Sequence, residues 1–171
     1  MQQGAQVAFV QRTAVPEFVA EMTAQFQREP LFIQCDITDV TALQGAIAAT
    51  EAHFGAIDVL VNNAAVERNQ PASKVTGDAI DETLFVNLRQ AFMLCSAFAK
   101  PLFVSSGAIV NVSSTAAIGA GGTQGAYAAS KGGLNTLTKN LANEWANKGV
   151  RVNGVAPGLV DTEMWETTFE R

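Results

Sequence analysis

Short apolar runs and longer amphipathic segments alternate along the whole chain. The runs predict strands, and they are Gln6–Val10, Leu31–Ile33, Ile57–Val61, Ala108–Val112 and Val150–Val155. Segments with apolar residues three and four positions apart predict helices, and they are Val15–Phe26, Val40–Phe54, Asp78–Lys100 and Tyr127–Asn147. This alternation is typical of an α/β fold with a parallel sheet. No repeat or linker interrupts it, so residues 1–171 are predicted to form a single domain.

Turn and cap residues predict where several helices begin and end. Pro16 suits a first helical turn, and the segment Asp36–Asp39 is expected to cap the helix that Gly55 ends. That helix is expected to bury Val40, Leu43, Ile47 and Phe54. Pro101 is expected to stop or kink the long helix that precedes it.

The composition narrows the class of protein. Of 171 residues, 48% are apolar and 16% are charged, which suits one compact globular domain. The net charge is -5 and no basic run occurs, which argues against a nucleic-acid partner. No apolar stretch approaches the roughly 20 residues of a membrane span. The two cysteines, Cys35 and Cys95, are too few for a disulfide framework, so a cytoplasmic protein is predicted.

Three chemically capable side chains are expected to converge. Tyr127 and Lys131 are four residues apart on a predicted helix and therefore share one face. Ser114 follows a predicted buried strand, and ligands of parallel sheets bind at the carboxyl ends of strands. The alternative is an exposed aromatic side chain beside a solvated lysine. No metal site is predicted, because His53 has no second ligand at suitable spacing.

Five motifs in order make the chain resemble the short-chain dehydrogenase/reductase family. They are Asn62-Asn63-Ala64-Ala65, Asn87 within 86–89, the segment 111–114 ending at Ser114, Tyr127 with Lys131, and the segment 150–158. The resemblance implies a Rossmann-like doubly wound parallel sheet. It also implies an NAD(P)-dependent oxidoreductase that interconverts a secondary alcohol and a ketone, with a sugar or a 3-oxoacyl thioester as substrate. The polar stretch 67–70 resembles sugar-oxidising members of the family, and the small-residue helix Tyr127–Asn147 is equally similar to 3-oxoacyl-carrier-protein reductases.

The resemblance assigns roles within the catalytic set. Tyr127 would donate or accept the proton, and Ser114 would hold the substrate oxygen. Lys131 would bind the cofactor ribose, and Asn87 would support a proton relay. Because free tyrosine has a pKa of about 10, we expect the Lys131 ammonium to stabilise the Tyr127 phenolate.

The resemblance also predicts the residues that contact the cofactor. Besides Tyr127 and Lys131 they are Asp36, Ile37, Asn63, Ala64, Ala65, Pro157, Gly158, Val160 and Thr162. Asp36 is equally suited to capping a helix. Gln11 and Arg12 stand where an acidic residue would favour NAD, and a guanidinium binds phosphate well, so NADP is favoured over NAD.

Relative to the family pattern, the chain is expected to lack the N-terminal glycine-rich segment and the C-terminal lid. The sheet is therefore expected to be truncated at both ends, because the absent strand would lie between the first two strands and the other three. Either these two groups of strands close up directly and lose the phosphate site, or one flank stays unpaired and exposes backbone and apolar surface. The alternative function is a catalytically silent fragment that keeps the motifs without a dinucleotide phosphate site. The expected partners are a small-molecule substrate and further copies of the chain, paired as a homodimer or homotetramer through Asp78–Lys100 and Tyr127–Asn147.

Overall fold

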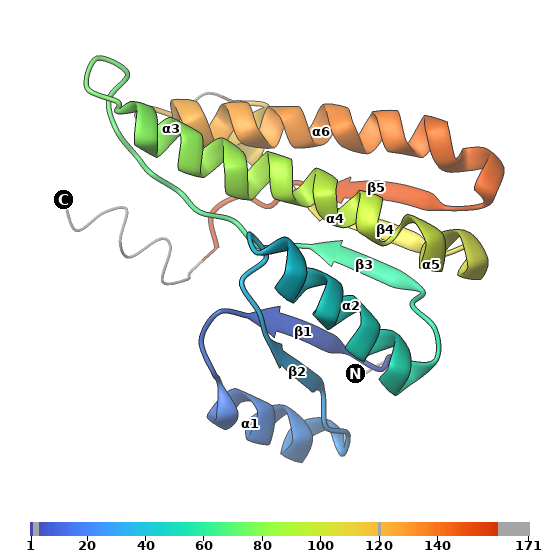
Figure 1. Cartoon of the computed structure of the whole chain (residues 1–171). Coiled ribbons are helices and arrows are strands. Elements are labelled where there is room, and N and C mark those ends of the chain that lie inside the picture. The colour runs from blue at the N-terminus through green and yellow to red at the C-terminus, as the bar shows by residue number, and fades with distance from the viewer. Residues whose placement is uncertain (2–3, 120, 161–171) are drawn as a thin grey trace. The chain divides into compact units, whose positions relative to one another are not determined.

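The computed structural model describes residues 1, 4–119 and 121–160 of the chain (Figure 1). They belong to two compact units, Met1–Ile57 and Asp58–Arg171. The expected cofactor residue Thr162 lies outside the described residues. The described strands form two separate parallel sheets, one of two strands and one of three, so the two groups of strands do not pair with each other.

The first unit is a strand–helix–strand–helix segment. Its elements are β1 (Ala8–Gln11), α1 (Pro16–Phe26), β2 (Leu31–Gln34) and α2 (Val40–Phe54). The two strands pair in parallel from Ala8 opposite Leu31 to Gln11 opposite Gln34. Phe9 packs against Phe18 and Phe32 with ring centroids 5.6 and 5.2 Å apart, which joins α1 and β2 to β1.

The caps of α2 confirm most of the sequence prediction and correct part of it. Asp39 is the N-cap, and its Oδ1 accepts hydrogen bonds from the Thr41 and Ala42 amides at 2.8 and 3.1 Å. Gly55 ends the helix at a φ of 79°, in the left-handed region that glycine adopts without strain. Asp36 does not cap the helix; its Oδ1 accepts from the Thr38 amide and hydroxyl in a local turn. Of the residues expected on the buried face, Leu43 is buried and Ile47 and Phe54 are half-buried, but Val40 is 48% exposed.

The second unit is a three-stranded parallel sheet with helices packed on it. The strands β3 (Val59–Asn62), β4 (Ala108–Val112) and β5 (Arg151–Val155) lie in the order β3-β4-β5. Ile109 of the central strand is fully buried, whereas Val59 and Val61 of β3 are 54% and 55% exposed. Side chains alternate between the two faces of a strand, so only one face of β3 is buried among the described residues.

The long helix predicted from residue 78 is interrupted. It consists of α3 (Gly77–Leu84), a π-helical segment η1 (Phe85–Gln90) and α4 (Ala91–Ala97), and a separate helix α5 (Ala99–Ser105) follows. The break lies at Phe98, within the turn that precedes Pro101, so the predicted interruption is confirmed, although the chain resumes as α5 directly afterwards. Pro101 lies in the first turn of α5, where its missing N–H leaves no helical hydrogen bond unmade.

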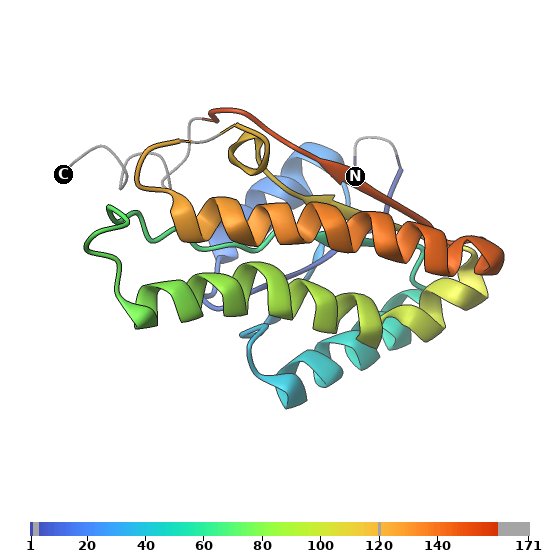
Figure 2. The same ribbon diagram turned by 90° about the horizontal axis from the view of Figure 1, so that it is seen from above.

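The longest helix, α6 (Gly125–Trp145), packs against α3, η1 and β5. Two short 3₁₀ turns, η2 (Thr115–Ala117) and η3 (Ala146–Lys148), precede and follow it. Figures 1 and 2 show α6 lying beside α3 and α4 and running in the same direction. No helix among the described residues has the length and apolar content that a membrane span requires.

Candidate active site

The carboxyl ends of β3, β4 and β5 and the amino ends of α3 and α6 lie at the same end of the second unit (Figures 1 and 2). Ser114 follows β4 as the N-cap of η2, and Tyr127 lies in the first turn of α6. Parallel strands connected by helices produce this arrangement, because each chain segment leaves the sheet at the same edge.

The structure brings Tyr127 and Ser114 together. Hydrogen bonding with Ser114 lowers the pKa of Tyr127, but burial raises that pKa by more, and the Glu67 carboxylate raises it further. The pKa of Tyr127 therefore lies above that of free tyrosine, and the phenol is neutral at pH 7. A neutral phenol is a proton donor.

Lys131 lies one helical turn after Tyr127, with its Nζ 5.7 Å from the centroid of the tyrosine ring. The residue is 2% exposed, and its Nζ donates to the Val112 carbonyl oxygen at 2.7 Å. Burial lowers the pKa of the ammonium to about 8. The expectation that Lys131 depresses the pKa of Tyr127 is not met, since burial and Glu67 outweigh the hydrogen bond from Ser114.

Asn87 joins the helical layer to the segment after β3. Its Oδ1 accepts from the Val66 amide at 2.8 Å, and its Nδ2 donates to the Val66 carbonyl at 2.8 Å and to Ser130 Oγ at 3.1 Å. Ser130 Oγ in turn donates to the Tyr127 carbonyl at 2.7 Å. Asn87 lies within the π-helical segment η1, a geometry that is frequent at functional sites. The side-chain amide of Asn87 thus bonds to Val66 and to Ser130, and it links the segment after β3 to α6.

The residues that follow β3 and β5 have different surroundings. Asn63 and Ala64 are exposed and Ala65 is half-buried, whereas Asn62 is buried and donates to Asn111 Oδ1 at 2.8 Å and Cys95 Sγ at 3.3 Å. Asn62 therefore has a packing role.

After β5, the half-buried Pro157 accepts a hydrogen bond from the Thr115 amide at 2.9 Å, which brings its segment to the residue next to Ser114. Gly158 and Val160 are exposed.

Four of the expected cofactor residues lie in the first unit. Gln11 ends β1 and Arg12 follows it, both exposed, while Asp36 and Ile37 are half-buried after β2. Hydrogen bonds from the Thr38 amide and hydroxyl lower the pKa of Asp36, and the nearby charge of Arg12 lowers it further. Within this unit the structure thus brings Arg12 close to Asp36.

Sequence reasoning did not assign two residues beside Tyr127. Gln124 Nε2 donates to Glu67 Oε1 at 2.6 Å, across 57 residues of sequence. Glu67 is half-buried, and its charge acts on the tyrosine. Glu67 lies in the polar stretch that follows β3, which marks it as a candidate site residue. Its contact with Gln124 could not be predicted, because it depends on how the fold brings two loops together.

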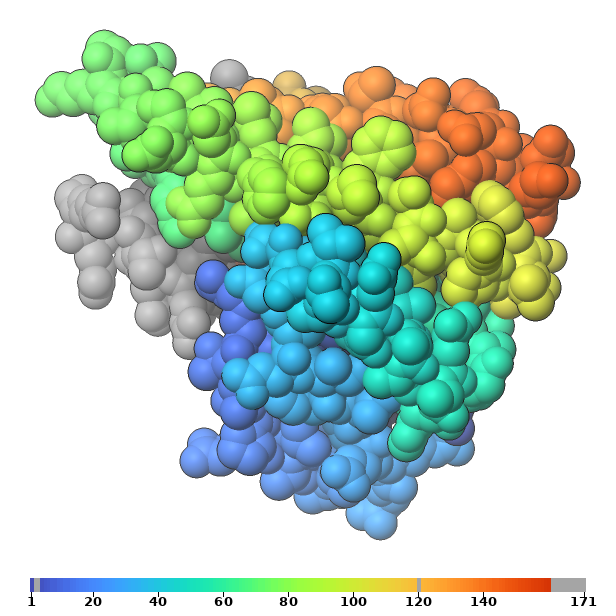
Figure 3. All heavy atoms as spheres, in the orientation of Figure 1, coloured from blue at the N-terminus to red at the C-terminus, as the bar shows by residue number. Residues whose placement is uncertain are grey.

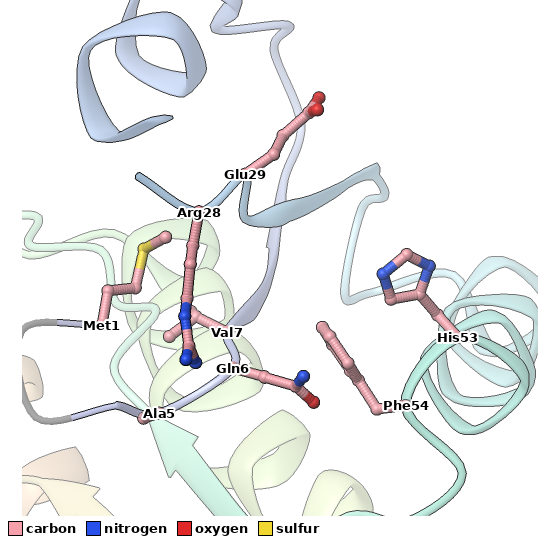
Figure 4. A pocket seen from close by; sticks show the side chains of 8 residues that line it. All are labelled: Met1, Ala5, Gln6, Val7, Arg28, Glu29, His53 and Phe54. Atoms are coloured by element: carbon pink, nitrogen blue, oxygen red, sulfur yellow. The ribbon is translucent and has the colours of Figure 1, made fainter. Parts of the chain in front are cut away.

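Two cavities in the described structure lie away from these residues. One of about 310 Å³ lies between α6 and β5. The other, of about 270 Å³, lies in the first unit, where Figure 4 shows Arg28 extending toward Gln6 and Glu29 pointing away. The Arg28 guanidinium donates to the Gly4 carbonyl at 2.9 Å, which accounts for its position. No group of three or more potential metal ligands occurs in the part of the chain that the structure describes.

Comparisons with known proteins agree with the motifs. The profile of the short chain dehydrogenase family matches residues 1–171. A D-threitol dehydrogenase of Mycolicibacterium smegmatis is 44% identical over 137 residues, which cover 80% of this chain and 53% of that protein. The chain thus spans about half the length of this curated relative.

Solved structures resemble the fold closely. A gluconate 5-dehydrogenase from Burkholderia cenocepacia, in complex with NADP and tartrate, superposes with a TM-score of 0.86 and 31% identity. The match covers 98% of this chain and 67% of that one. An NAD⁺-bound xylitol dehydrogenase superposes with a TM-score of 0.88 and 28% identity, covering 98% and 66% of the two chains.

Proposed function

The chain belongs to the short-chain dehydrogenase family, and on that premise we propose that it interconverts a secondary alcohol and a ketone by hydride transfer with NADP or NAD. The observation that carries this proposal is the placement of Ser114 after β4 and of Tyr127 in the first turn of α6, where Ser114 acts on the pKa of Tyr127 and the Lys131 ammonium lies 5.7 Å from the tyrosine ring. These are the hydroxyl donors and the buried cation that carbonyl reduction requires.

Each side chain has a distinct task in this proposal. The neutral Tyr127 hydroxyl donates a proton to the carbonyl oxygen during reduction, and the Ser114 hydroxyl donates a hydrogen bond to the same oxygen. Both stabilise the negative charge that develops there. The nicotinamide, when bound, supplies or accepts the hydride. Asn87 keeps the segments of Val66 and Tyr127 in fixed positions through its hydrogen bonds.

Lys131 supports the assignment of a dinucleotide cofactor. An ammonium has three N–H donors, and among the described residues the Val112 carbonyl is the one acceptor of Nζ. A buried cation with further donors suits the hydroxyls of a ribose. Asn63, Ala64 and Ala65 would form part of the cofactor pocket. The segment of Pro157, Gly158 and Val160 would line the nicotinamide, and Asp36 and Ile37 would contact the adenine.

The test of the catalytic assignment is Tyr127→Phe, which removes one hydroxyl. We expect turnover of alcohol substrates to fall by about 10²- to 10⁴-fold, the usual contribution of a general acid. The circular dichroism spectrum should stay unchanged, since the aromatic ring remains and the fold is kept. An unchanged turnover rate would exclude Tyr127 as the proton donor.

We propose NADP as the preferred cofactor, with NAD as the alternative. Arg12 is exposed and makes no salt bridge among the described residues, so its guanidinium is available for a 2′-phosphate. Fluorescence titration should show tighter binding of NADPH than of NADH, and Arg12→Ala should abolish the difference. Equal affinities in the unaltered chain would contradict the preference, and no binding by a folded chain would favour the catalytically silent alternative.

We also propose that copies of the chain pair through η1 and α4. Phe85, Phe92 and Met93 are exposed there, and Phe92 is 51% exposed. The surface of α3, η1 and α4 is the green to yellow-green part of Figure 3. Light scattering should show a dimer or tetramer that Phe92→Glu converts to a smaller species; a monomer at micromolar concentration would contradict the proposal.

A further inference from the structure

The Glu67 carboxylate is a charged group beside the proposed proton donor that the family motifs do not include. The backbone before it is fixed, because the Asn87 side chain bonds both the amide and the carbonyl of Val66 at 2.8 Å. Asn87 also donates to Ser130, whose hydroxyl donates to the Tyr127 carbonyl. Glu67 therefore starts from a backbone position that is tied to the first turn of α6.

Two hydrogen bonds hold the loop of Glu67 against the loop before α6. Gln124 Nε2 donates to Glu67 Oε1 at 2.6 Å, and the Gln70 amide donates to the Thr123 carbonyl at 3.0 Å. A carboxylate that accepts from an amide forms a charge-assisted bond, which is stronger than a neutral one. The Glu67 side chain is thus positioned by the fixed backbone of Val66 before it and by the hydrogen bond that its carboxylate accepts from Gln124.

The charge of Glu67 is not neutralised by its neighbour in sequence. Arg68 donates through Nε and Nη2 to both carboxylate oxygens of Glu82 at 2.7 Å. Among the described residues, Glu67 Oε2 accepts no hydrogen bond. One carboxylate oxygen therefore remains available to a ligand.

Glu67 and Lys131 are the charged groups that act at Tyr127 among the described residues. Lys131 Nζ lies 5.7 Å from the ring centroid, and Glu67 is the carboxylate whose charge acts on the phenol. Gln124, which holds Glu67, is the N-cap of α6, and Tyr127 lies in the first turn of the same helix, so a substrate bound by Tyr127 and Ser114 is exposed to the charge of Glu67.

We propose that Glu67, held by Gln124, is a specificity-determining residue that selects neutral polyols and sugars over carboxylate-bearing substrates. Its open oxygen accepts hydrogen bonds from hydroxyls next to the reacting carbon, and its charge repels an acid group there. The proposal rests on the proposed oxidoreductase function. Charge repulsion at such a site corresponds to roughly 10- to 100-fold discrimination.

The test compares Glu67→Gln with the control Asp81→Asn, which removes one negative charge from an exposed position of α3. The substrates are a neutral tetritol and the aldonate with the same number of carbon atoms. Glu67→Gln should raise kcat/KM for the aldonate relative to the tetritol at least tenfold, mainly through KM. Asp81→Asn should leave the ratio unchanged. An unchanged ratio in Glu67→Gln overturns the proposal.

A second measurement separates this inference from the proposed function. Tyr127 is the single tyrosine in the sequence, so tyrosinate absorbance reports its ionisation without substrate or cofactor. Glu67→Gln should lower the pKa of Tyr127 and Asp81→Asn should not; no shift overturns the placement of Glu67. If the unaltered chain turns over neither compound, calorimetry of tetritol and aldonate binding decides: a gain in aldonate affinity in Glu67→Gln supports selection, and equal relative affinities refute it.

Discussion

The Lys131 ammonium has a pKa of about 8 in the folded chain, compared with 10.5 in water, because burial disfavours its charged form. Between these values the unfolded chain binds more protons than the folded chain does. The contribution of Lys131 to the free energy of unfolding therefore rises as the pH increases from about 8 toward 10.5. The full difference corresponds to about 3 kcal/mol.

The first prediction is that Lys131→Met weakens this pH dependence. Urea unfolding of the unaltered chain should show a free energy of unfolding that increases between pH 8 and pH 10 relative to that of the variant. Above pH 10 the trend should weaken, because the raised pKa of Tyr127 makes the folded chain retain a proton that the unfolded chain loses. Lys139→Met, at an exposed position of α6, is the control and should parallel the unaltered chain; identical slopes in all three would contradict the prediction.

At the scale of elements, two glycines that the sequence does not distinguish have opposite surroundings. Gly107 precedes β4, and a Cβ atom there would collide with the Asp58 backbone carbonyl. Gly132 lies within α6, and a Cβ atom there would have no atom within 4 Å. The backbone contact cannot relax as a side chain can, so only Gly107 depends on the absence of a Cβ.

We therefore predict that Gly107→Ala destabilises the chain by about 2 kcal/mol or more. Gly132→Ala should stabilise it by about 0.5–1 kcal/mol, since alanine favours the helix. Thermal or urea unfolding of both variants checks this. Equal effects of the two substitutions would show that the close approach at Gly107 is not maintained in solution.

At the scale of the whole molecule, the two sheets differ in how much they bury. The sheet of the first unit has two strands, and α1 contributes no buried residue. In the second unit β4 lies between two strands, and Ile109 and Asn111 are fully buried. A two-stranded sheet is marginal without additional packing. Local opening should therefore be easier in the first unit.

Native-state hydrogen exchange should reveal this difference. We predict that the amides of β4 are protected at least about tenfold more strongly than those of β1, because opening β4 exposes more apolar surface. The measurement is mass spectrometry or NMR of the whole chain under native conditions. Equal protection of both strands would indicate that the units unfold as one cooperative structure.

Much of this architecture follows from local sequence. The strand β4 and the helix α1 begin and end within one residue of their predicted positions, because apolar periodicity, Pro16 and the turn after Val112 are local signals. The grouping of Tyr127, Lys131 and Ser114 was also predictable. Residues four apart on a helix share one face, and parallel strands end at the same edge of the sheet, so once this fold forms the three side chains lie near each other.

Only the tertiary structure decided the features that depend on distant segments. The π-helical segment around Asn87 and the exposure of Val40 are two such features, because the periodicity of apolar residues specifies neither. The pKa of Tyr127 is raised because burial and Glu67 act on it from outside its own helix. The local sequence determines which side chains can share a face, whereas solvation and charge at the site depend on which loops the fold brings together.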